Sequence, residues 1–144
     1  MFDITNKNIL VTGATSGIGK AAALKLSLLG ANIFFVARNQ QKAQLLVDEI
    51  FEISDKEAVP IIADLSSQAD IRSVAQVFNS FNIPLHVLLN NAGLINKERR
   101  ETVDGLEEVF AINHIAYFLL TMLFSHLEIF FLINVVTFLS YLES

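Results

Sequence analysis

The sequence predicts an α/β protein in which a parallel β-sheet carries helices on both of its faces. Two observations lead to this prediction. Short runs of continuous apolar residues alternate along the chain with longer segments of helical periodicity, and strands that are apolar at every position are typically buried on both faces. Strands separated by helices pair in parallel, through right-handed crossovers, into a doubly wound sheet.

The expected elements follow one another in a regular order, and the helices carry start or stop signals. Ser16 stands at the N-cap of the first helix, and Gly30 follows its last turn. Ser67 and Asp70 form a capping-box pattern before the third helix. The predicted strands are 8–12, 32–37, 59–63 and 86–89, and the predicted helices are 17–29, 40–53 and 67 to about 81.

The composition excludes several classes of protein. A chain of 144 residues suffices for one domain with a buried core. Its net charge of -5, without a basic tract, argues against nucleic acid as a partner. The absence of cysteine excludes a disulfide framework, a thiolate zinc site and a cysteine nucleophile, and we expect no metal site. Because no basic start with an apolar run opens the chain, we expect a cytoplasmic protein.

A glycine-rich loop, residues 12–19 (TGATSGIG), joins the first predicted strand to the first helix. A pyrophosphate needs backbone close by and unpaired N–H groups directed at it. Glycines permit the close approach, and a helix N-terminus supplies the donors with a partial positive charge. Three glycines between an apolar strand and a helix favour this interpretation over an ordinary turn.

The spacing T-G-x-x-x-G-I-G resembles that of the short-chain dehydrogenases/reductases. The resemblance covers residues 5 to about 125 and extends to Asp64-Leu65, to residues 90–93 (NNAG) and to Asn113. Residues 36–39 (VARN) resemble the retinol-dehydrogenase-like branch most. The resemblance implies a Rossmann-like domain over 1–144, incomplete at its C-terminal end, with a divergent apolar tail over 126–144.

The resemblance also assigns cofactor contacts. Asp64 would accept a hydrogen bond from the exocyclic amine of adenine, although it could instead cap the following helix. The segment after the fourth strand would support the central sheet and line the ribose of the cofactor. The residues that match the cofactor site of the family are Gly13, Ser16, Gly17, Ile18, Gly19, Asp64, Leu65, Asn90, Ala92 and Gly93.

Arg38 determines the expected choice of cofactor. Enzymes that prefer NAD(H) place Asp or Glu at the end of the second strand, where it holds the ribose hydroxyls. Residues 31–43 contain no acidic residue, and Arg38 stands there instead. A guanidinium could bind a 2′-phosphate. NADP(H) is therefore favoured over NAD(H), with a surface arginine as the alternative.

The activity implied by the resemblance is hydride transfer between a nicotinamide and a small alcohol or carbonyl substrate. Asn113 matches the asparagine that bends its helix and holds a water of the proton relay. However, the proton-donating pair Tyr-x-x-x-Lys does not occur, because position 121 is Thr121 and no residue follows Tyr141 by four. Three alternatives stay open: a chain of an oxidoreductase, a non-catalytic NADP(H)-binding module, and an inactive gene product that does not fold stably.

The last third of the sequence is strongly apolar. Asp104 and Glu107 are expected to cap a long helix whose apolar face is formed by Leu106, Val109, Phe110, Asn113, Tyr117, Leu120 and Phe124. Residues 109–127 contain no Asp, Glu, Lys or Arg over 19 positions, but Asn113, His114 and His126 interrupt the segment and argue against a membrane span. A homodimer through the 104–125 helix is the favoured partner, with membrane association as the alternative. Residues 129–136 are either a fifth strand or part of an aberrant tail.

Overall fold

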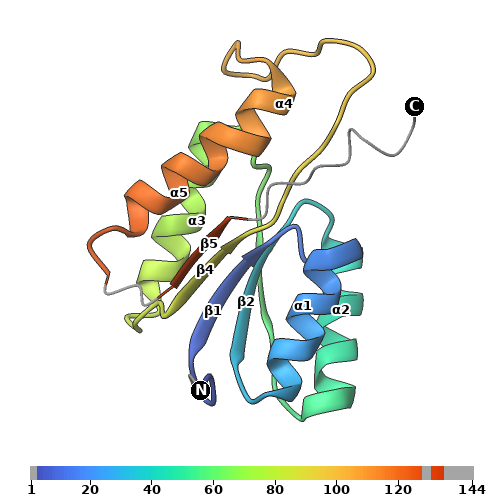
Figure 1. Ribbon diagram of the computed structural model, residues 1–144, viewed down its shortest axis with the longest axis vertical. Helices are drawn as coiled ribbons and strands as arrows, with labels where there is room; N and C mark the ends of the chain where they lie inside the picture. Colours follow the sequence, from blue (N-terminus) through green and yellow to red (C-terminus); the bar gives the residue numbers. More distant parts are fainter. Residues whose placement is uncertain (1–2, 128–130, 135–144) are drawn as a thin grey trace.

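Within residues 3–127 and 131–134, which this computed structural model describes, five parallel strands form one sheet in the order β3-β2-β1-β4-β5. Helices cover both faces of the sheet: α1 and α2 lie on one side, and α3 and α5 on the other (Figure 1). The strands are β1 (Asn8–Thr12), β2 (Asn32–Ala37), β3 (Val59–Ile62), β4 (Val87–Asn90) and β5 (Phe131–Asn134). The helices are α1 (Gly17–Leu28), α2 (Gln40–Ser54), α3 (Gln68–Ser80), α4 (Glu108–Phe110), the π-helical turn η1 (Ala111–Ile115) and α5 (Ala116–Phe124).

The predicted fold class is confirmed. β1 pairs in parallel with β2 on one side and with β4 on the other, so it lies inside the sheet. The predicted bounds of β1 and β2 hold to the residue, whereas β3 ends one residue earlier and β4 begins one residue later than expected. The order of strands turns back between β1 and β4, which creates a switch point at the carboxyl edge of the sheet.

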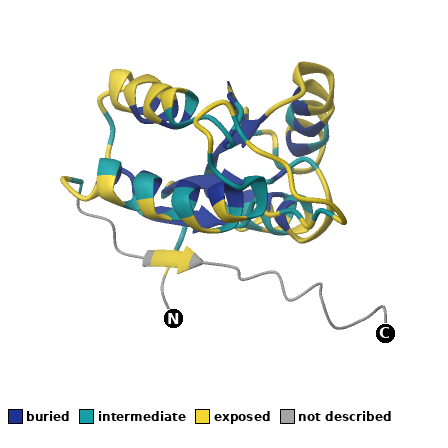
Figure 2. Ribbon diagram, turned by 90° about the horizontal axis from the view of Figure 1, so that it is seen from above, coloured by how far each residue is buried: buried dark blue, intermediate teal, exposed yellow. Residues whose placement is uncertain are grey.

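Side chains that alternate along the strands divide the core into two halves. Leu10, Phe34 and Leu88 face α3 and α5, whereas Val11, Phe35 and Leu89 face α1 and α2. Buried residues therefore gather on the strands between the two helix layers (Figure 2). Because both faces are covered, the strands can be apolar throughout, which is the pattern that the sequence shows.

The ends of α1 and α3 are formed as the sequence predicts. Ser16 occupies the N-cap position of α1, although its side chain accepts no main-chain hydrogen bond from the described residues. Gly30 adopts a φ of +90°, and the N–H groups of Gly30 and Ala31 donate to the carbonyls of Ser27 and Leu26, which closes a Schellman motif. At α3, the Ser67 hydroxyl accepts from the N–H of Asp70 at 3.3 Å.

The prediction of one long helix after residue 104 is only partly correct. Glu107 is the N-cap and accepts from two main-chain N–H groups, but Asp104 does not cap this helix. The helix is interrupted by the π-helical turn η1, which adds one residue to the repeat and rotates the following face. Phe110 precedes this turn and is out of phase with the buried residues after it, so it is 49% exposed although it was expected on the buried face. The buried positions are Ala111, Ile112, Ala116, Leu120 and Phe124.

Residues 129–136 were expected to form either a fifth strand or part of an aberrant tail, and the structure contains a fifth strand within them. β5 pairs in parallel with β4, with Leu88 opposite Leu132. The remaining positions of that segment, and Ser140 and Tyr141, lie outside the described residues. Among the helices of the described residues, none has the length and apolar character needed to cross a bilayer.

Candidate functional site

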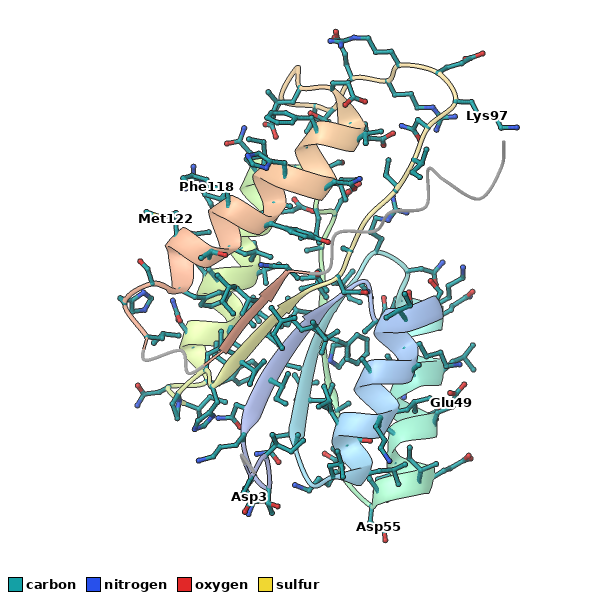
Figure 3. The ribbon with its side chains drawn as sticks, viewed as in Figure 1. Asp3, Glu49, Asp55, Lys97, Phe118 and Met122 are labelled. Atoms are coloured by element: carbon teal, nitrogen blue, oxygen red, sulfur yellow. The ribbon has the colours of Figure 1, made fainter. Side chains whose placement is uncertain are left out.

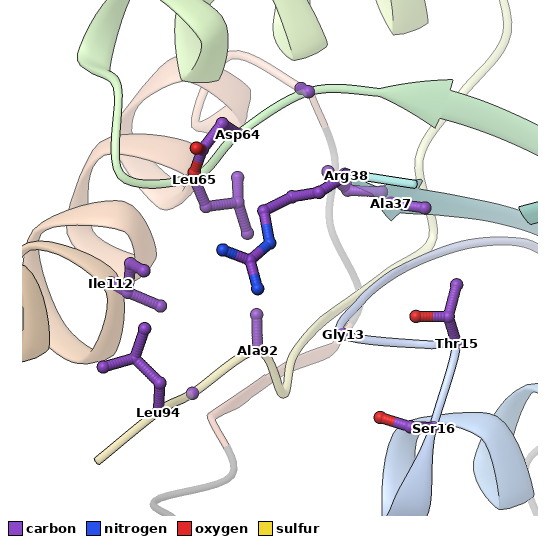
Figure 4. Close-up of a pocket in the computed structure, with 13 residues that line it drawn as sticks. Gly13, Thr15, Ser16, Ala37, Arg38, Asp64, Leu65, Ala92, Leu94 and Ile112 are labelled. Atoms are coloured by element: carbon purple, nitrogen blue, oxygen red, sulfur yellow. The ribbon is translucent and has the colours of Figure 1, made fainter. Parts of the chain in front are cut away.

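A pocket lies at the carboxyl edge of the sheet, where the strands β1, β2, β3 and β4 end (Figure 4). The η1 turn closes it through Ile112. The sheet geometry brings these segments together, because parallel strands all present their carboxyl ends at one edge. The lining residues are Gly13, Thr15, Ser16, Val36, Ala37, Arg38, Ala63, Asp64, Leu65, Ala92, Gly93, Leu94 and Ile112.

The three glycines of the 12–19 loop are required for different reasons. Gly13 has a φ of +67°, and a Cβ there would lie 2.7 Å from the Cα of Ala92. A Cβ on Gly19 would overlap the carbonyl oxygen of Gly13 and the Asn91 amide. Gly17 has a φ of +54° but no atom lies near the position of a Cβ, so glycine is needed there for its backbone conformation. The same open space leaves the first turn of α1 accessible to a ligand.

Thr12 and Asn91 fix this loop to the segment at the end of β4, and neither is among the expected site residues. The buried Thr12 hydroxyl accepts from the N–H groups of Asn91 and Ala92, each at 3.0 Å. In return, the Asn91 amide donates to the carbonyls of Thr12 and Gly13, each at 3.2 Å. A polar residue after the apolar run Ile9–Val11, at the carboxyl end of the strand, is the signal that could have pointed to Thr12.

Asp64 lies at the pocket wall, directly after β3. Its Oδ1 accepts from the N–H of Ser66 at 2.9 Å. Ser67 is the N-cap of α3, so the alternative role of Asp64 as the cap of that helix is not the one observed. Among the described residues no donor reaches Oδ2 of Asp64, which leaves a carboxylate oxygen for a ligand in the pocket.

Arg38 follows the last residue of β2, and its side chain extends over the pocket. Figure 4 shows the guanidinium between Leu65, Ile112 and Ala92. Arg38 is exposed, and within residues 3–127 and 131–134 its guanidinium forms no hydrogen bond or ion pair. A cation without a protein partner at the end of β2 can therefore bind an anion in the pocket.

Asn113 and Tyr117 fix the helix that closes the pocket. Asn113 lies in the π-helical turn and binds both main-chain groups of Leu94, each at 2.9 Å. The Tyr117 hydroxyl donates to the carbonyl of Ala92 at 2.7 Å. Burial raises the pKa of Tyr117 to about 12. His114, next to Asn113, is exposed and stacks on the ring of Phe110.

The eleven residues expected to bind the cofactor fall into two groups, whereas Asn113, the expected catalytic residue, lies in the η1 turn and does not line the pocket. Those that line the pocket are Gly13, Ser16, Arg38, Asp64, Leu65, Ala92 and Gly93. Four others lie outside its wall: Asn90 is buried in the sheet, Gly19 is buried against the loop, Gly17 is exposed, and Ile18 is 66% exposed on α1. Within the described residues, His, Asp and Glu side chains form no cluster of three that could hold a metal ion.

Comparison with known families identifies the chain. The family described as short chain dehydrogenase matches residues 7–128, which include the pocket and the strands β1 to β4. The chain belongs to the short-chain dehydrogenase family.

Relatives within this family support the predicted branch. The chain is 42% identical over 115 residues to human polyprenol dehydrogenase, which covers 79% of this chain and 35% of that protein. It is 37% identical over 121 residues to human retinol dehydrogenase 11, covering 83% of this chain and 38% of that protein. The chain thus spans little more than a third of the length of these curated relatives.

Solved structures share the fold. A protein from Shigella flexneri described as a short chain dehydrogenase, complexed with NADP, superimposes with a TM-score of 0.73 at 30% identity. The match covers 87% of this chain and 55% of that one. A related protein from Escherichia coli, complexed with NADPH, gives the same TM-score, identity and coverage.

Proposed function

We propose that this chain forms a single NADP(H)-binding domain over residues 1–144, as part of an oxidoreductase of alcohols and carbonyl compounds. The observation that carries the proposal is the position of Arg38. Its guanidinium follows β2, points over the pocket and has no partner within the described residues. No carboxylate stands there to hold the ribose hydroxyls of NAD(H).

The pocket offers groups for each part of the dinucleotide. The open first turn of α1, at Ser16 and Gly17, suits the pyrophosphate, because its main-chain N–H groups have no intrahelical acceptor. Asp64 and Leu65 would hold the adenine ring, with the second carboxylate oxygen accepting from the exocyclic amine. Ala92 and Gly93 would line a ribose. When bound, the nicotinamide supplies or accepts the hydride of the reaction.

Cofactor selectivity tests the proposal. The variant Arg38→Asp removes one charge-assisted contact with a 2′-phosphate, a loss of about 1.5–3 kcal/mol or more than tenfold in affinity. Titration of wild type and variant with NADPH and NADH should show weaker binding of NADPH with NADH spared. Lys42→Asp, an exposed cation on α2, is the matched control and should change neither affinity. Equal loss for both dinucleotides, or no loss, would contradict the role of Arg38.

The substrate class is proposed from the family and its relatives. Human polyprenol dehydrogenase and human retinol dehydrogenase 11 are named for alcohol substrates. By analogy, a small alcohol or its carbonyl product would meet the nicotinamide beside Asn113. The π-helical turn there supports the bend that the resemblance implies, and we propose that Asn113 also has the water-holding role that goes with it.

A second candidate function is a binding module without turnover, and Tyr117 favours it for these 144 residues. The chain contains no Tyr-x-x-x-Lys. Tyr117 does not replace it, because its hydroxyl donates to Ala92 and its pKa is raised to about 12 by burial. A proton donor must lie within hydrogen-bond reach of the reacting oxygen. We therefore propose that these residues bind NADP(H) without reducing a carbonyl on their own.

The outer face of the α4–α5 segment supports the proposed homodimer. Phe118 and Met122 point away from the sheet (Figure 3) and are 59% and 54% exposed. Phe110, on the same segment, is a third large apolar side chain that is exposed, at 49%, and exposed apolar surface can mark a protein interface. Light scattering should show a dimer that Phe118→Glu dissociates, whereas a monomeric wild type would contradict this proposal.

A further inference from the structure

The wall of the pocket that contains Asp64 and Leu65 is held from outside by two carboxylates. Asp70, on α3, accepts from the N–H of Asp64 at 2.9 Å through Oδ2, and its Oδ1 lies 3.3 Å from the Ser67 hydroxyl. Asp104 accepts from the N–H of Gln68 at 2.8 Å, across 36 residues of sequence. Gln68 is the first residue of α3, so its N–H has no intrahelical acceptor.

Asp104 is presented by a preformed turn. The Thr102 hydroxyl accepts from the N–H groups of Asp104 and Leu106 at 3.2 and 3.3 Å. Gly105 has a φ of +72° and donates to the carbonyl of Thr102 at 2.9 Å. The turn leads directly into Glu107, the N-cap of the helical segment that carries Ile112. Asp104 therefore links the two walls of the pocket, the one at Asp64–Leu65 and the one at Ile112.

We propose that Asp104 is a positioning residue of the cofactor site, which fixes the spacing between these two walls through the N–H of Gln68. The inference rests on the proposed NADP(H) function. Asp104 does not line the pocket itself, so it acts only through the segment that follows β3. Without this bond the segment after β3 keeps its own local hydrogen bonds and the one to Asp70 but loses its tie to the 102–107 turn, so the adenine end of the cofactor loses part of its preformed site.

Two substitutions remove the same hydrogen bond from opposite sides. Asp104→Ala removes the acceptor. Gln68→Pro removes the donor but suits α3, because proline is favoured at the first position of a helix and Ser67 before it has an extended backbone. Asp104→Asn keeps an oxygen that can accept this bond and serves as the rescue variant. Asp48→Ala, on the exposed side of α2, is the matched control.

The readout is affinity for NADPH and for 2′,5′-ADP, which contains only the adenine end. Losing one hydrogen bond should weaken both ligands about three- to tenfold in Asp104→Ala and in Gln68→Pro. Asp104→Asn and Asp48→Ala should stay close to wild type, and the two disruptive changes combined should add little. Amide exchange of Asp64, Ser66 and, where the N–H is retained, Gln68 should be faster in the cofactor-free variants.

The outcomes separate this inference from the proposed function. If the wild type binds NADPH and Asp104→Ala binds it equally well, Asp104 is only a helix cap and the inference is overturned, whatever happens to the melting temperature. Unchanged amide exchange at Asp64 and Ser66 would also overturn it. If the folded wild type binds neither ligand, the proposed function itself fails, and this inference with it.

Discussion

The side-chain amide of Asn113 pairs with the main chain of Leu94 in both directions. Oδ1 accepts from the N–H of Leu94, and Nδ2 donates to its carbonyl, each at 2.9 Å. The segment after β4 is thereby bound to the π-helical turn by a pair of hydrogen bonds, in the same way that a neighbouring β-strand would pair with Leu94.

Replacing Asn113 should therefore destabilise the fold. Asn113→Ala leaves both main-chain groups of Leu94 without their partner, at a cost of about 1–3 kcal/mol. Urea unfolding should show a lower midpoint with an unchanged slope. Gln76→Ala, an exposed amide on α3, is the matched control and should stay within about 0.5 kcal/mol of wild type. Equal stability of Asn113→Ala and wild type would show that Leu94 finds other partners.

A methyl group at Gly19 should disrupt the glycine loop. Its Cβ would overlap the carbonyl oxygen of Gly13 and the Asn91 amide, and the backbone oxygen cannot move without shifting the loop. Gly19→Ala should weaken NADPH binding by more than about tenfold, which corresponds to about 1.4 kcal/mol or more. Lys25→Ala, exposed on the same helix, is the control. Undiminished affinity would mean that the loop does not touch the cofactor.

His86 should make the stability of the protein depend on pH. Its Nδ1 accepts from the N–H of Asn8 at 2.9 Å, so the structure needs this nitrogen unprotonated. Burial, with a contribution from Lys7, lowers the pKa of His86 below its usual 6.5. The neutral form is thus favoured in the folded state, and its stabilisation is fully present above about pH 6.5 and lost as the pH falls from there toward the lowered value.

Urea unfolding at pH 7.5 and pH 5.0 measures this dependence. The difference between the two conditions should be smaller in His86→Gln than in wild type, because the variant does not titrate. His126→Gln, which removes an exposed histidine, should keep the difference of the wild type. The same difference in wild type and both variants would assign the dependence to other groups.

The purified 144-residue chain should bind NADPH without catalysing its oxidation by a carbonyl substrate. General acid–base catalysis contributes roughly 10²–10⁴-fold, and no tyrosine among the described residues is placed for it. Loss of NADPH absorbance with a panel of aldehydes and ketones, including retinal, should stay at background. Steady turnover that Tyr141→Phe abolishes would disprove this and assign the proton donor to a residue outside the described ranges.

Much of the fold could be predicted from the sequence because its signals are local. The continuous apolar strands, the capping pair Ser67–Asp70 and the terminal Gly30 each act within a few residues. The site was predictable to the extent that a short motif marks it, as in the 12–19 loop.

Contacts between segments that are distant in the sequence could not be predicted, because no local sequence pattern marks them. The bonds between Asn91 and the glycine loop span 78 and 79 residues, and that between Asp104 and Gln68 spans 36. Asp104 was expected to cap its own helix and instead caps α3. The π-helical turn changed the helical period at Ala111–Ile115, so that Phe110 before it is out of phase with the buried residues after it, although the regular repeat placed it inward.

The most direct test of the account is calorimetric titration of the folded wild-type chain with NADPH. The pocket at the carboxyl edge predicts one saturable site per chain. NADPH should bind at least tenfold more tightly than NADH, because the proposed site places the 2′-phosphate against Arg38. A chain that melts cooperatively but binds no dinucleotide, or binds NADH as tightly as NADPH, would contradict it.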